Sequence, residues 1–269
     1  MTLLKRIQNE LTGLKEQRDN FQPLSKKQVE ILDAQTRYEH VWSSNAIEGN
    51  TLKKYETTSI LQTGLTSQGT PIKDVLETLD LNDAYNYMMD LVSRKQALTQ
   101  RVIRDLNRFV TAKTAKDMAS SGRYRAISVW PNGLQNHPYV DPFEIQPAMD
   151  DLIKWSKKAQ IKLHPVQYAA DLHEKFVSIH PFEDGNGRTA RLLMNMALTQ
   201  AGYPIVNIQP DVQERSAYMN ALETSRVSGD LTPFENIIAH YSESALKQRI
   251  KTLKLNEQNI KDADQDFDL

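Results

Sequence analysis

The 269-residue chain contains no cysteine, which excludes disulfide frameworks, thiolate zinc sites and cysteine nucleophiles. No stretch approaches the roughly 20 apolar residues that a helix needs to span a bilayer. The first residues, MTLLKRIQNELTGLKEQRD, become charged after two leucines, whereas a secretory signal needs an apolar run of about 7–15 residues. These absences predict a cytoplasmic protein without a membrane anchor.

An excess of charge of either sign is also missing. The 33 lysines and arginines nearly balance the 34 acidic residues, so the formal net charge is −1. No global field therefore attracts the chain to nucleic acid or to an anionic membrane, and neither is expected as a partner. Any nucleotide site must be local. The composition is compatible with a homo-oligomer and does not specify one.

Apolar residues recur at spacings of three and four over much of the chain, which predicts amphipathic helices. The pattern is clearest in the ranges 26–47, 72–94, 99–112, 165–179 and 188–201. The length suits one large domain or two small ones, and no internal repeat or clear linker divides the sequence, so we expect a mainly α single domain. The polar, acidic stretch after Leu255 is expected to fray.

One stretch departs from the helical pattern. Residues 124–140, YRAISVWPNGLQNHPYV, carry β-branched and aromatic residues on both sides of Pro131, Asn132 and Gly133, a typical turn sequence. This pattern predicts a small β-hairpin.

The segment IHPFEDGNGRTARLL, residues 179–193, concentrates groups suited to phosphate chemistry. Gly185, Asn186 and Gly187 favour a backbone nest whose N–H groups converge on an anion, at the start of a helix whose dipole attracts the same charge. Arg188 and Arg191 lie three residues apart on that helix and can bind further phosphate oxygens.

Two side chains before this loop complete the predicted chemistry. Asp184 offers a hard oxygen ligand for a Mg²⁺ ion that bridges phosphates. His180 ends the preceding helix before Pro181, and a neutral imidazole there can accept the proton of a hydroxyl group.

Two other interpretations of this segment were considered. Residues 185–190 also satisfy the loose dinucleotide-binding pattern G-x-G-x-x-A, with Asp211 at the distance of a ribose-binding acid. A helical apolar face runs through the supposed first strand, and strands do not alternate with helices along the chain, which disfavours a parallel sheet. A zinc site from His173, His180 and Asp184 would need an unusual ligand spacing. Single histidines are more often packed or surface residues, and we interpret the others so: His40, His137, His164, His173 and His240.

The sequence HPFEDGNGRTAR, residues 180–191, resembles the signature of the Fic family, H-P-F-x-[D/E]-G-N-G-R-x-x-R, at every fixed position. The resemblance implies a Fic-type helical bundle that transfers AMP from ATP to a Ser, Thr or Tyr hydroxyl of a protein and releases pyrophosphate, with Mg²⁺ as cofactor. His180 would be the base, Asp184 the metal ligand, residues 185–187 the phosphate cradle, and Arg188 and Arg191 the triphosphate-binding residues. The target would be a protein with an exposed hydroxyl, and auto-modification is compatible with this chemistry.

The same resemblance divides the chain into an N-terminal helical segment, 1–55, a catalytic core, 56–235, and a C-terminal helix with a polar tail, 236–269. The hairpin at 124–140 resembles in location the family's flap, which aligns the target segment by adding a strand to it. Tyr218, Met219 and Leu222 either line the adenine pocket, as the resemblance implies, or form a core face.

A second signal lies in SSNAIEGN, residues 43–50, where Glu48 falls in the last turn of a predicted helix that Gly49 ends. A carboxylate there opposes the helix dipole unless a cation offsets it. Ser44 and Glu48 fit the family's inhibitory pattern, [S/T]-x-x-x-E-[G/N], which implies that Glu48 pairs with Arg191 and blocks a productive triphosphate.

The sequence therefore predicts an autoinhibited, Mg²⁺-dependent protein AMP-transferase. Two alternatives remain open. One is a hydrolase that removes AMP from a modified protein with Glu48 positioning water, and the other is a nucleotide-sensing module without catalysis.

Overall fold

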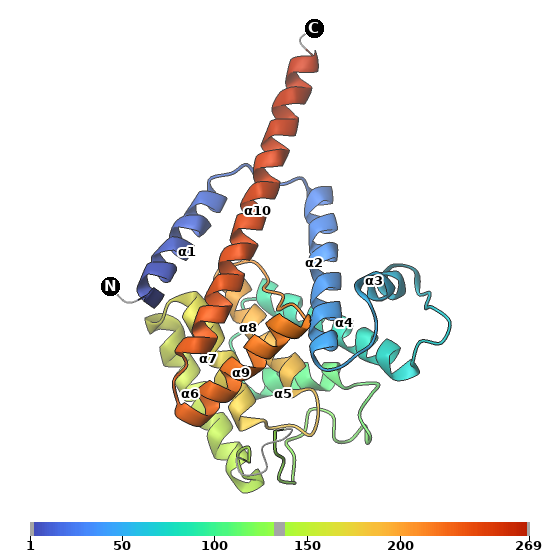
Figure 1. Cartoon of the computed structure of the whole chain (residues 1–269), viewed down its shortest axis with the longest axis vertical. Helices are drawn as coiled ribbons and strands as arrows, with labels where there is room; N and C mark the ends of the chain where they lie inside the picture. Colours follow the sequence, from blue (N-terminus) through green and yellow to red (C-terminus); the bar gives the residue numbers. More distant parts are fainter. Residues whose placement is uncertain (1–2, 132–137, 268–269) are drawn as a thin grey trace.

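The computed structural model describes the backbone of residues 3–131 and 138–267, and the side chains of residues 7–131 and 138–260. Within these ranges the chain is mainly helical, as predicted, and Figure 1 shows the helices gathered into one bundle. The elements are α1 (Leu3–Asp19), α2 (Lys26–Ile47), α3 (Lys54–Thr63), α4 (Ile72–Ser93), α5 (Gln100–Val110), η1 (Pro142–Glu144), α6 (Ile145–Lys162), α7 (Pro165–Ile179), α8 (Asn186–Gln200), α9 (Val212–Ser228) and α10 (Thr232–Phe267).

Helices α7 and α8 form the centre of the bundle. They pack closely on each other, while α4 and α5 pack on α8, and α6 and α10 on α7. Nearly every residue of α8 is buried, so this helix is apolar or hydrogen-bonded on all sides rather than amphipathic. The loop between α7 and α8 is thereby held between two helices that cannot move independently.

The helix boundaries follow local chemistry. Ser25 and Gln28 form a capping box at the start of α2, in which each side chain binds the other's backbone N–H. Pro165 occupies the first turn of α7, where its missing N–H leaves no bond unmade. Asp211 caps α9 by accepting hydrogen bonds from the N–H groups of Gln213 and Glu214.

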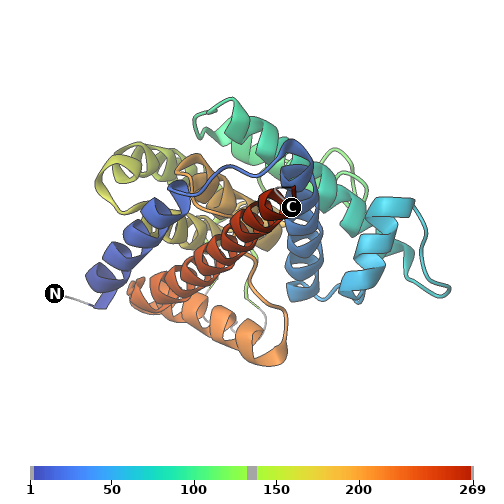
Figure 2. The same ribbon diagram turned by 90° about the horizontal axis from the view of Figure 1, so that it is seen from above.

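The C-terminal helix is longer than the sequence suggested. Figures 1 and 2 show α10 crossing the bundle, with α1 packed along it, and extending beyond the other helices. The expectation that the backbone frays after Leu255 is wrong, because helix continues to Phe267. Residues 255–267 contain no proline or glycine, so helical propensity persists although the apolar stripe weakens.

The predicted hairpin appears only in part. No residue of the described ranges is in a strand, and one backbone hydrogen bond, from the Tyr139 N–H to the Val129 carbonyl at 3.1 Å, joins the two arms. Asn132 and Gly133, on which the expected turn depended, lie outside the described residues, as does His137.

Two further expectations can be compared with this architecture. The dinucleotide-binding alternative is wrong, since the described part of the chain has no parallel sheet and Asp211 is a helix cap. A search of the same residues finds no helix with the length and apolarity required to cross a membrane.

Asn195 provides a test of how α8 holds the following loop. This fully buried side chain accepts a hydrogen bond from the Val206 N–H at 2.8 Å and donates one to the Val206 carbonyl at 2.9 Å. Asn195→Ala leaves both backbone groups without these partners, so we expect the free energy of unfolding in urea to fall by about 2–4 kcal/mol. Asn259→Ala, at an exposed position of α10, should change it by less than about 0.5 kcal/mol. Equal losses in the two variants would contradict the assignment.

Candidate active site

His180 ends α7 in a left-handed backbone conformation. Its φ is 52°, and its N–H donates to the Phe176 carbonyl at 3.1 Å. In the described ranges only Lys95 among non-glycine residues also has a positive φ. Such a conformation is uncommon and costs free energy, so it persists where the surrounding structure enforces it. Pro181 prevents α7 from continuing, and the imidazole is thereby directed out of the helix.

The surroundings of His180 keep its imidazole neutral. Burial, with a smaller contribution from the Arg125 guanidinium, lowers the pKa of His180 to about 4. The ring stacks on Tyr139, with the two ring centroids 3.9 Å apart. Nδ1 is buried, so Nε2 is the nitrogen that an incoming group can reach. The imidazole can therefore accept a proton at neutral pH.

The loop between His180 and α8 is held by one side chain. Asn186 accepts a hydrogen bond from the Phe182 N–H at 3.0 Å and donates one to the Phe182 carbonyl at 2.8 Å. Of the three predicted nest residues only Gly185 has a positive φ, 77°, whereas Asn186 and Gly187 already belong to α8. The expected nest is thus a helix N-terminus preceded by one left-handed glycine. A Cβ at Gly185 would lie 2.9 Å from Val110, so glycine is required there for space as well as for backbone angle.

Two buried residues that the sequence gave no reason to select support this loop. Asn107, on α5, donates to the Asp184 carbonyl at 2.9 Å and accepts from the Gly122 N–H at 3.2 Å. Arg125 donates from Nε to the His180 carbonyl at 2.8 Å, and its other nitrogens bind the carbonyls of Ile127 and Val140. Arg125 therefore joins both arms of the 124–140 segment to the turn at His180. These partners are distant in sequence, and no local pattern could have identified them.

Asp184 stands at the mouth of the site, with its side chain 61% exposed and 3.3 Å from Arg188 Nη2. In the described residues no cluster of three or more His, Cys, Asp or Glu could hold a metal by itself, which disfavours the zinc alternative. His173, one of its supposed ligands, is buried and hydrogen-bonded to Tyr218. A lone exposed carboxylate suits Mg²⁺, because this ion commonly takes one or two carboxylates together with substrate phosphates and water.

The two arginines of the loop are buried, 3% and 2% exposed, but have different partners. Arg188 lies near Asp184 and, at 3.9 Å, Glu77, and two of its nitrogens have no hydrogen bond. Arg191 is fully engaged. Its Nε donates to Ser44 Oγ at 2.8 Å, and its Nη2 donates to the Ser44 carbonyl at 2.8 Å and to Glu48 Oε1 at 2.7 Å.

Glu48 reaches this position from the C-terminal end of α2. Its carboxylate lies over the start of α8, where a Cβ added to Gly187 would collide with Oε1. Burial acts to raise the pKa of Glu48, but the Arg191 guanidinium prevails and holds it below its usual value. The side chain remains 37% exposed, open to solvent on one side. An ionised carboxylate thus occupies the anion-binding end of α8.

Tyr218 and His173 form the layer behind Arg191. Arg191 Nη1 lies 3.3 Å from the Tyr218 hydroxyl, which is 2.9 Å from His173 Nε2, and both residues are buried. Burial lowers the pKa of His173, so its imidazole is neutral. Tyr218 is buried, as a core position requires, and makes a polar contact with Arg191 that spacing alone could not indicate; its role in an adenine pocket stays a prediction.

Taken as chemistry, the site combines a neutral imidazole, a helix N-terminus, two buried guanidiniums and an exposed carboxylate within one loop and its neighbours. Groups of these types in this arrangement are suited to bind an anionic chain of phosphates and to accept a proton beside it. The protein therefore belongs to a class of helical bundles that carry a neutral imidazole and an anion-binding helix N-terminus at the loop between α7 and α8.

Comparison with known proteins specifies the family within that class. The model of the Fic/DOC family matches residues 97–198. A Fic domain containing signaling protein from Bacteroides thetaiotaomicron is 30% identical, with a TM-score of 0.81 over 91% of this chain and 97% of that one. The chain belongs to the Fic/DOC family, which confirms the resemblance inferred from HPFEDGNGRTAR.

Two further relatives are animal proteins. The chain is 35% identical over 243 residues to the protein adenylyltransferase Fic of Aedes aegypti, which covers 89% of this chain and 47% of that protein. Fic-1 (aa134 - 508) from C. elegans superposes with a TM-score of 0.84 at 26% identity, covering 94% of this chain and 74% of that one. This chain spans about half the length of the curated relatives it matches.

The lowered pKa of Glu48 predicts a pH-dependent contribution to stability. Such a carboxyl group stabilises the folded state above its ordinary pKa, 4.5, and this stabilisation is lost as the pH falls through the lower value of the folded state. We expect the loss of unfolding free energy in Glu48→Gln to be largest near neutral pH and to shrink below that value, measured by urea denaturation. Glu30→Gln, at an exposed position of the same helix, should show no such trend. A pH-independent difference for Glu48→Gln would contradict the ion pair.

Proposed function

We propose that the protein is an autoinhibited AMP-transferase, which moves AMP from ATP to a Ser, Thr or Tyr hydroxyl of a target protein. The observation that carries this proposal is the position of the Glu48 carboxylate, at the N-terminus of α8 and 2.7 Å from Arg191. A carboxylate there occupies the place suited to a phosphate, beside a neutral imidazole. The name of the Aedes aegypti relative, protein adenylyltransferase, supports the same reaction.

The reaction needs little from the chain beyond positioning and one proton acceptor. His180 Nε2 takes the proton of the target hydroxyl while its oxygen forms a bond to the α-phosphorus. The bond from that phosphorus to the bridging oxygen breaks, and pyrophosphate leaves. The α8 N-terminus, Arg188 and Arg191 bind the negative oxygens, so charge is stabilised by groups already in place.

Mg²⁺ would be held by Asp184, whose exposed carboxylate can turn from Arg188 towards a metal bound to phosphates. When bound, the ion neutralises phosphate charge and orients the leaving group. Arg188 would then be free to bind phosphate oxygens, which suits the two of its nitrogens that have no hydrogen bond.

Inhibition follows from competition for one guanidinium. Arg191 cannot give the same nitrogens to Glu48 and to the triphosphate, and Ser44 adds two hydrogen bonds that favour the inhibited arrangement. A bias of about 2–3 kcal/mol towards this arrangement would reduce activity roughly a hundredfold. In this proposal residues 1–55 are the N-terminal helical segment, whose inhibitory helix ends near Gly49, residues 56–235 are the catalytic core, and residues 236–269 are the C-terminal helix and tail. The family match at 97–198 falls inside the proposed core.

Removal of Glu48 is the direct test. Glu48→Gly should raise the AMP incorporated from ATP and Mg²⁺, into the protein itself or a lysate, by about a hundredfold, because Arg191 becomes available to the triphosphate. Incorporation is measured by mass spectrometry. Glu48→Gly/His180→Ala is the control, and its adduct should be lost because the base is absent.

The same variants separate the two alternatives. A hydrolase that needs Glu48 would remove AMP from a pre-modified substrate as wild type and fail as Glu48→Gly, a result that would replace the proposed direction of reaction. ATP binding without transfer in any variant would indicate a nucleotide sensor and overturn the proposal.

The neutral state of His180 predicts the pH profile. A base with a pKa of about 4 is deprotonated throughout the range from pH 5.5 to 7.5, so transfer by Glu48→Gly should not decline as the pH is lowered across this range. Initial rates of AMP incorporation at saturating ATP and Mg²⁺ measure this profile. A sigmoidal loss centred near pH 6.5 would show that the imidazole is solvated in the active state and would contradict the prediction.

A further inference from the structure

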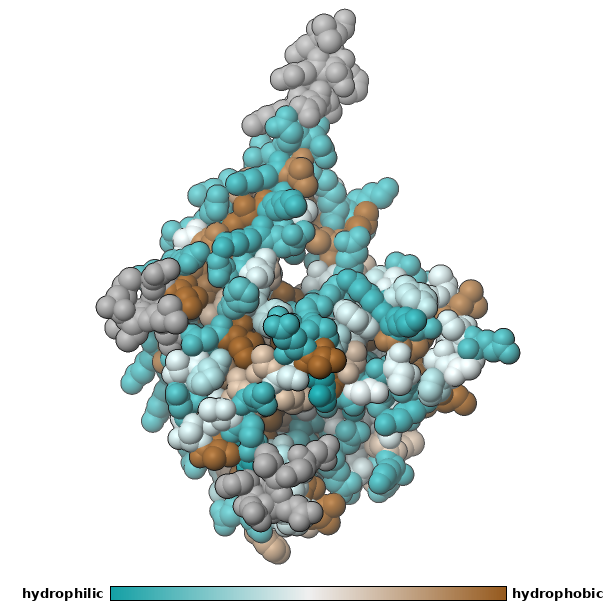
Figure 3. Space-filling model, viewed as in Figure 1, coloured by the Kyte–Doolittle hydropathy of each residue, from teal (hydrophilic) through white to brown (hydrophobic). Residues whose placement is uncertain are grey.

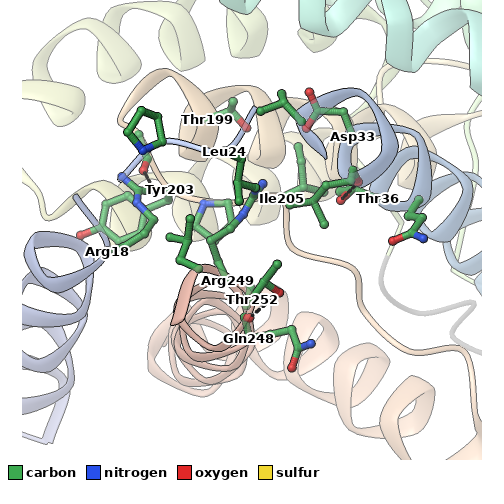
Figure 4. A pocket seen from close by; sticks show the side chains of 18 of the residues that line it. Arg18, Leu24, Asp33, Thr36, Thr199, Tyr203, Ile205, Gln248, Arg249 and Thr252 are labelled. Carbon is green, nitrogen blue, oxygen red and sulfur yellow. Dashed lines mark hydrogen bonds between the residues drawn. The ribbon is translucent and has the colours of Figure 1, made fainter. Parts of the chain in front are cut away.

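A second hollow lies away from the candidate active site. The cavity, of about 840 Å³, is bounded by the N-terminal part of α2, the segment that joins α1 to α2, α10 and the loop after α8. Figure 3 shows the hollow between α10 and α2, and Figure 4 shows side chains from all these elements around it. None of the residues assigned above to phosphate binding, proton transfer or inhibition lines this cavity.

Much of the cavity wall is apolar. Leu24 precedes α2, Leu32 lies on α2, Ile205 follows α8, and Leu253 lies on α10. The volume falls in the range of small-molecule sites, which are typically apolar with a few polar groups that orient the ligand. The cavity therefore has room for a small amphipathic molecule.

Arg249 supplies hydrogen-bond donors that the described part of the chain leaves unused. This half-buried residue of α10 lines the cavity, and in the described part of the chain its guanidinium makes no hydrogen bond and no ion pair within 4 Å. The other cation of the wall, Arg18, is engaged by Asp19 and by the Gly202 carbonyl. A half-buried guanidinium with unused donors gains charge-assisted hydrogen bonds from an anion placed beside it.

Two of the three acidic residues of the wall are paired with cations other than Arg249. The carboxylate of Asp19 is bound by Arg18 and Lys15, and that of Glu39 pairs with Lys54. Asp33, which is exposed and lines the same cavity, attracts the Arg249 guanidinium electrostatically but forms no ion pair with it within 4 Å. Asp33 therefore offsets part of the charge of Arg249 and leaves its hydrogen-bond donors available.

Tyr85 provides a neutral donor in the same cavity. The residue is only 4% exposed, and its hydroxyl makes no hydrogen bond among the described residues. Burial raises the pKa of this hydroxyl, so it remains protonated and can donate. The hydroxyl oxygen is not sealed from solvent, so this donor can reach water or a ligand in the cavity.

We propose that this cavity is a binding site for a small amphipathic anion, whose carboxylate or phosphate head is held by Arg249 and Tyr85 and whose hydrocarbon body packs on Leu24, Leu32 and Ile205. The site is separate from the proposed transferase chemistry and does not depend on it. One of its walls is α2, the helix that ends at Glu48.

Isothermal titration with octanoate tests the site, since it measures binding without any activity. Octanoate should bind once per chain, whereas octylammonium and 1-octanol, which share its hydrocarbon body, should bind at least about tenfold more weakly. Octyl phosphate distinguishes the two head groups, and saturable binding of either anion through Arg249 supports the proposal.

Variants connect the binding to the cavity. Arg249→Gln should weaken octanoate binding about tenfold and Tyr85→Phe a few-fold. Both should keep the thermal stability of the wild type, because neither group has a hydrogen-bond partner within the described chain. Lys251→Gln removes a charge from an exposed position of the same helix and should leave binding unchanged.

Equal binding of the three octyl compounds, or unchanged binding in Arg249→Gln, would overturn the proposal. So would a concentration-dependent dimer, seen by light scattering, that Arg249→Gln abolishes, because a second copy of the chain would then be the occupant.

Discussion

The guanidinium of Arg191 is the group around which the site is organised. It is buried at the centre of the bundle. Its N–H groups donate hydrogen bonds to the Ser44 oxygens, the Glu48 carboxylate and the Tyr218 hydroxyl, which hold it there. A buried cation is stable only when its donors are satisfied. Any state that removes Glu48 must therefore supply another anion, and a phosphate meets that requirement. In the proposed mechanism, inhibition and nucleotide binding are alternative ways of neutralising the same buried cation.

The surrounding helices make this competition possible. Helices α7 and α8 are buried along most of their length and pack closely on each other, so the loop between them is anchored at both ends. Asn186 closes the loop on itself, while Asn107 and Arg125 fix it to α5 and to the segment at 124–140. His180 can then be held in an uncommon backbone conformation, with its imidazole desolvated and neutral. In the proposed reaction, the packed core would hold His180 in place as the proton acceptor.

Much of the helical organisation could be predicted from sequence. The ranges of α2 and α7 match the apolar periodicity to the residue, because strong capping signals lie at their starts and a glycine or proline at their ends. The extension of α10 and the irregular arms at 124–140 could not be predicted so well. Acidic, polar residues do not prevent a helix when nothing interrupts it, and β-branched residues do not make a strand when the backbone is bound by a side chain such as Arg125 instead of a partner strand.

The sequence alone determined the chemistry of the loop, because the histidine, aspartate, glycines and arginines that carry it are contiguous and their spacing is set by one turn and one helix. It also indicated Ser44 and Glu48 as a pair on one helical face. Only the tertiary structure decided what those groups face. Contacts between residues far apart in the chain decide whether Arg191 meets Glu48 and whether His180 is desolvated. They also decide whether Arg249 and Tyr85 lack hydrogen-bond partners among the described residues around one cavity. Periodicity and local motifs contain no information on such distances, which packing sets.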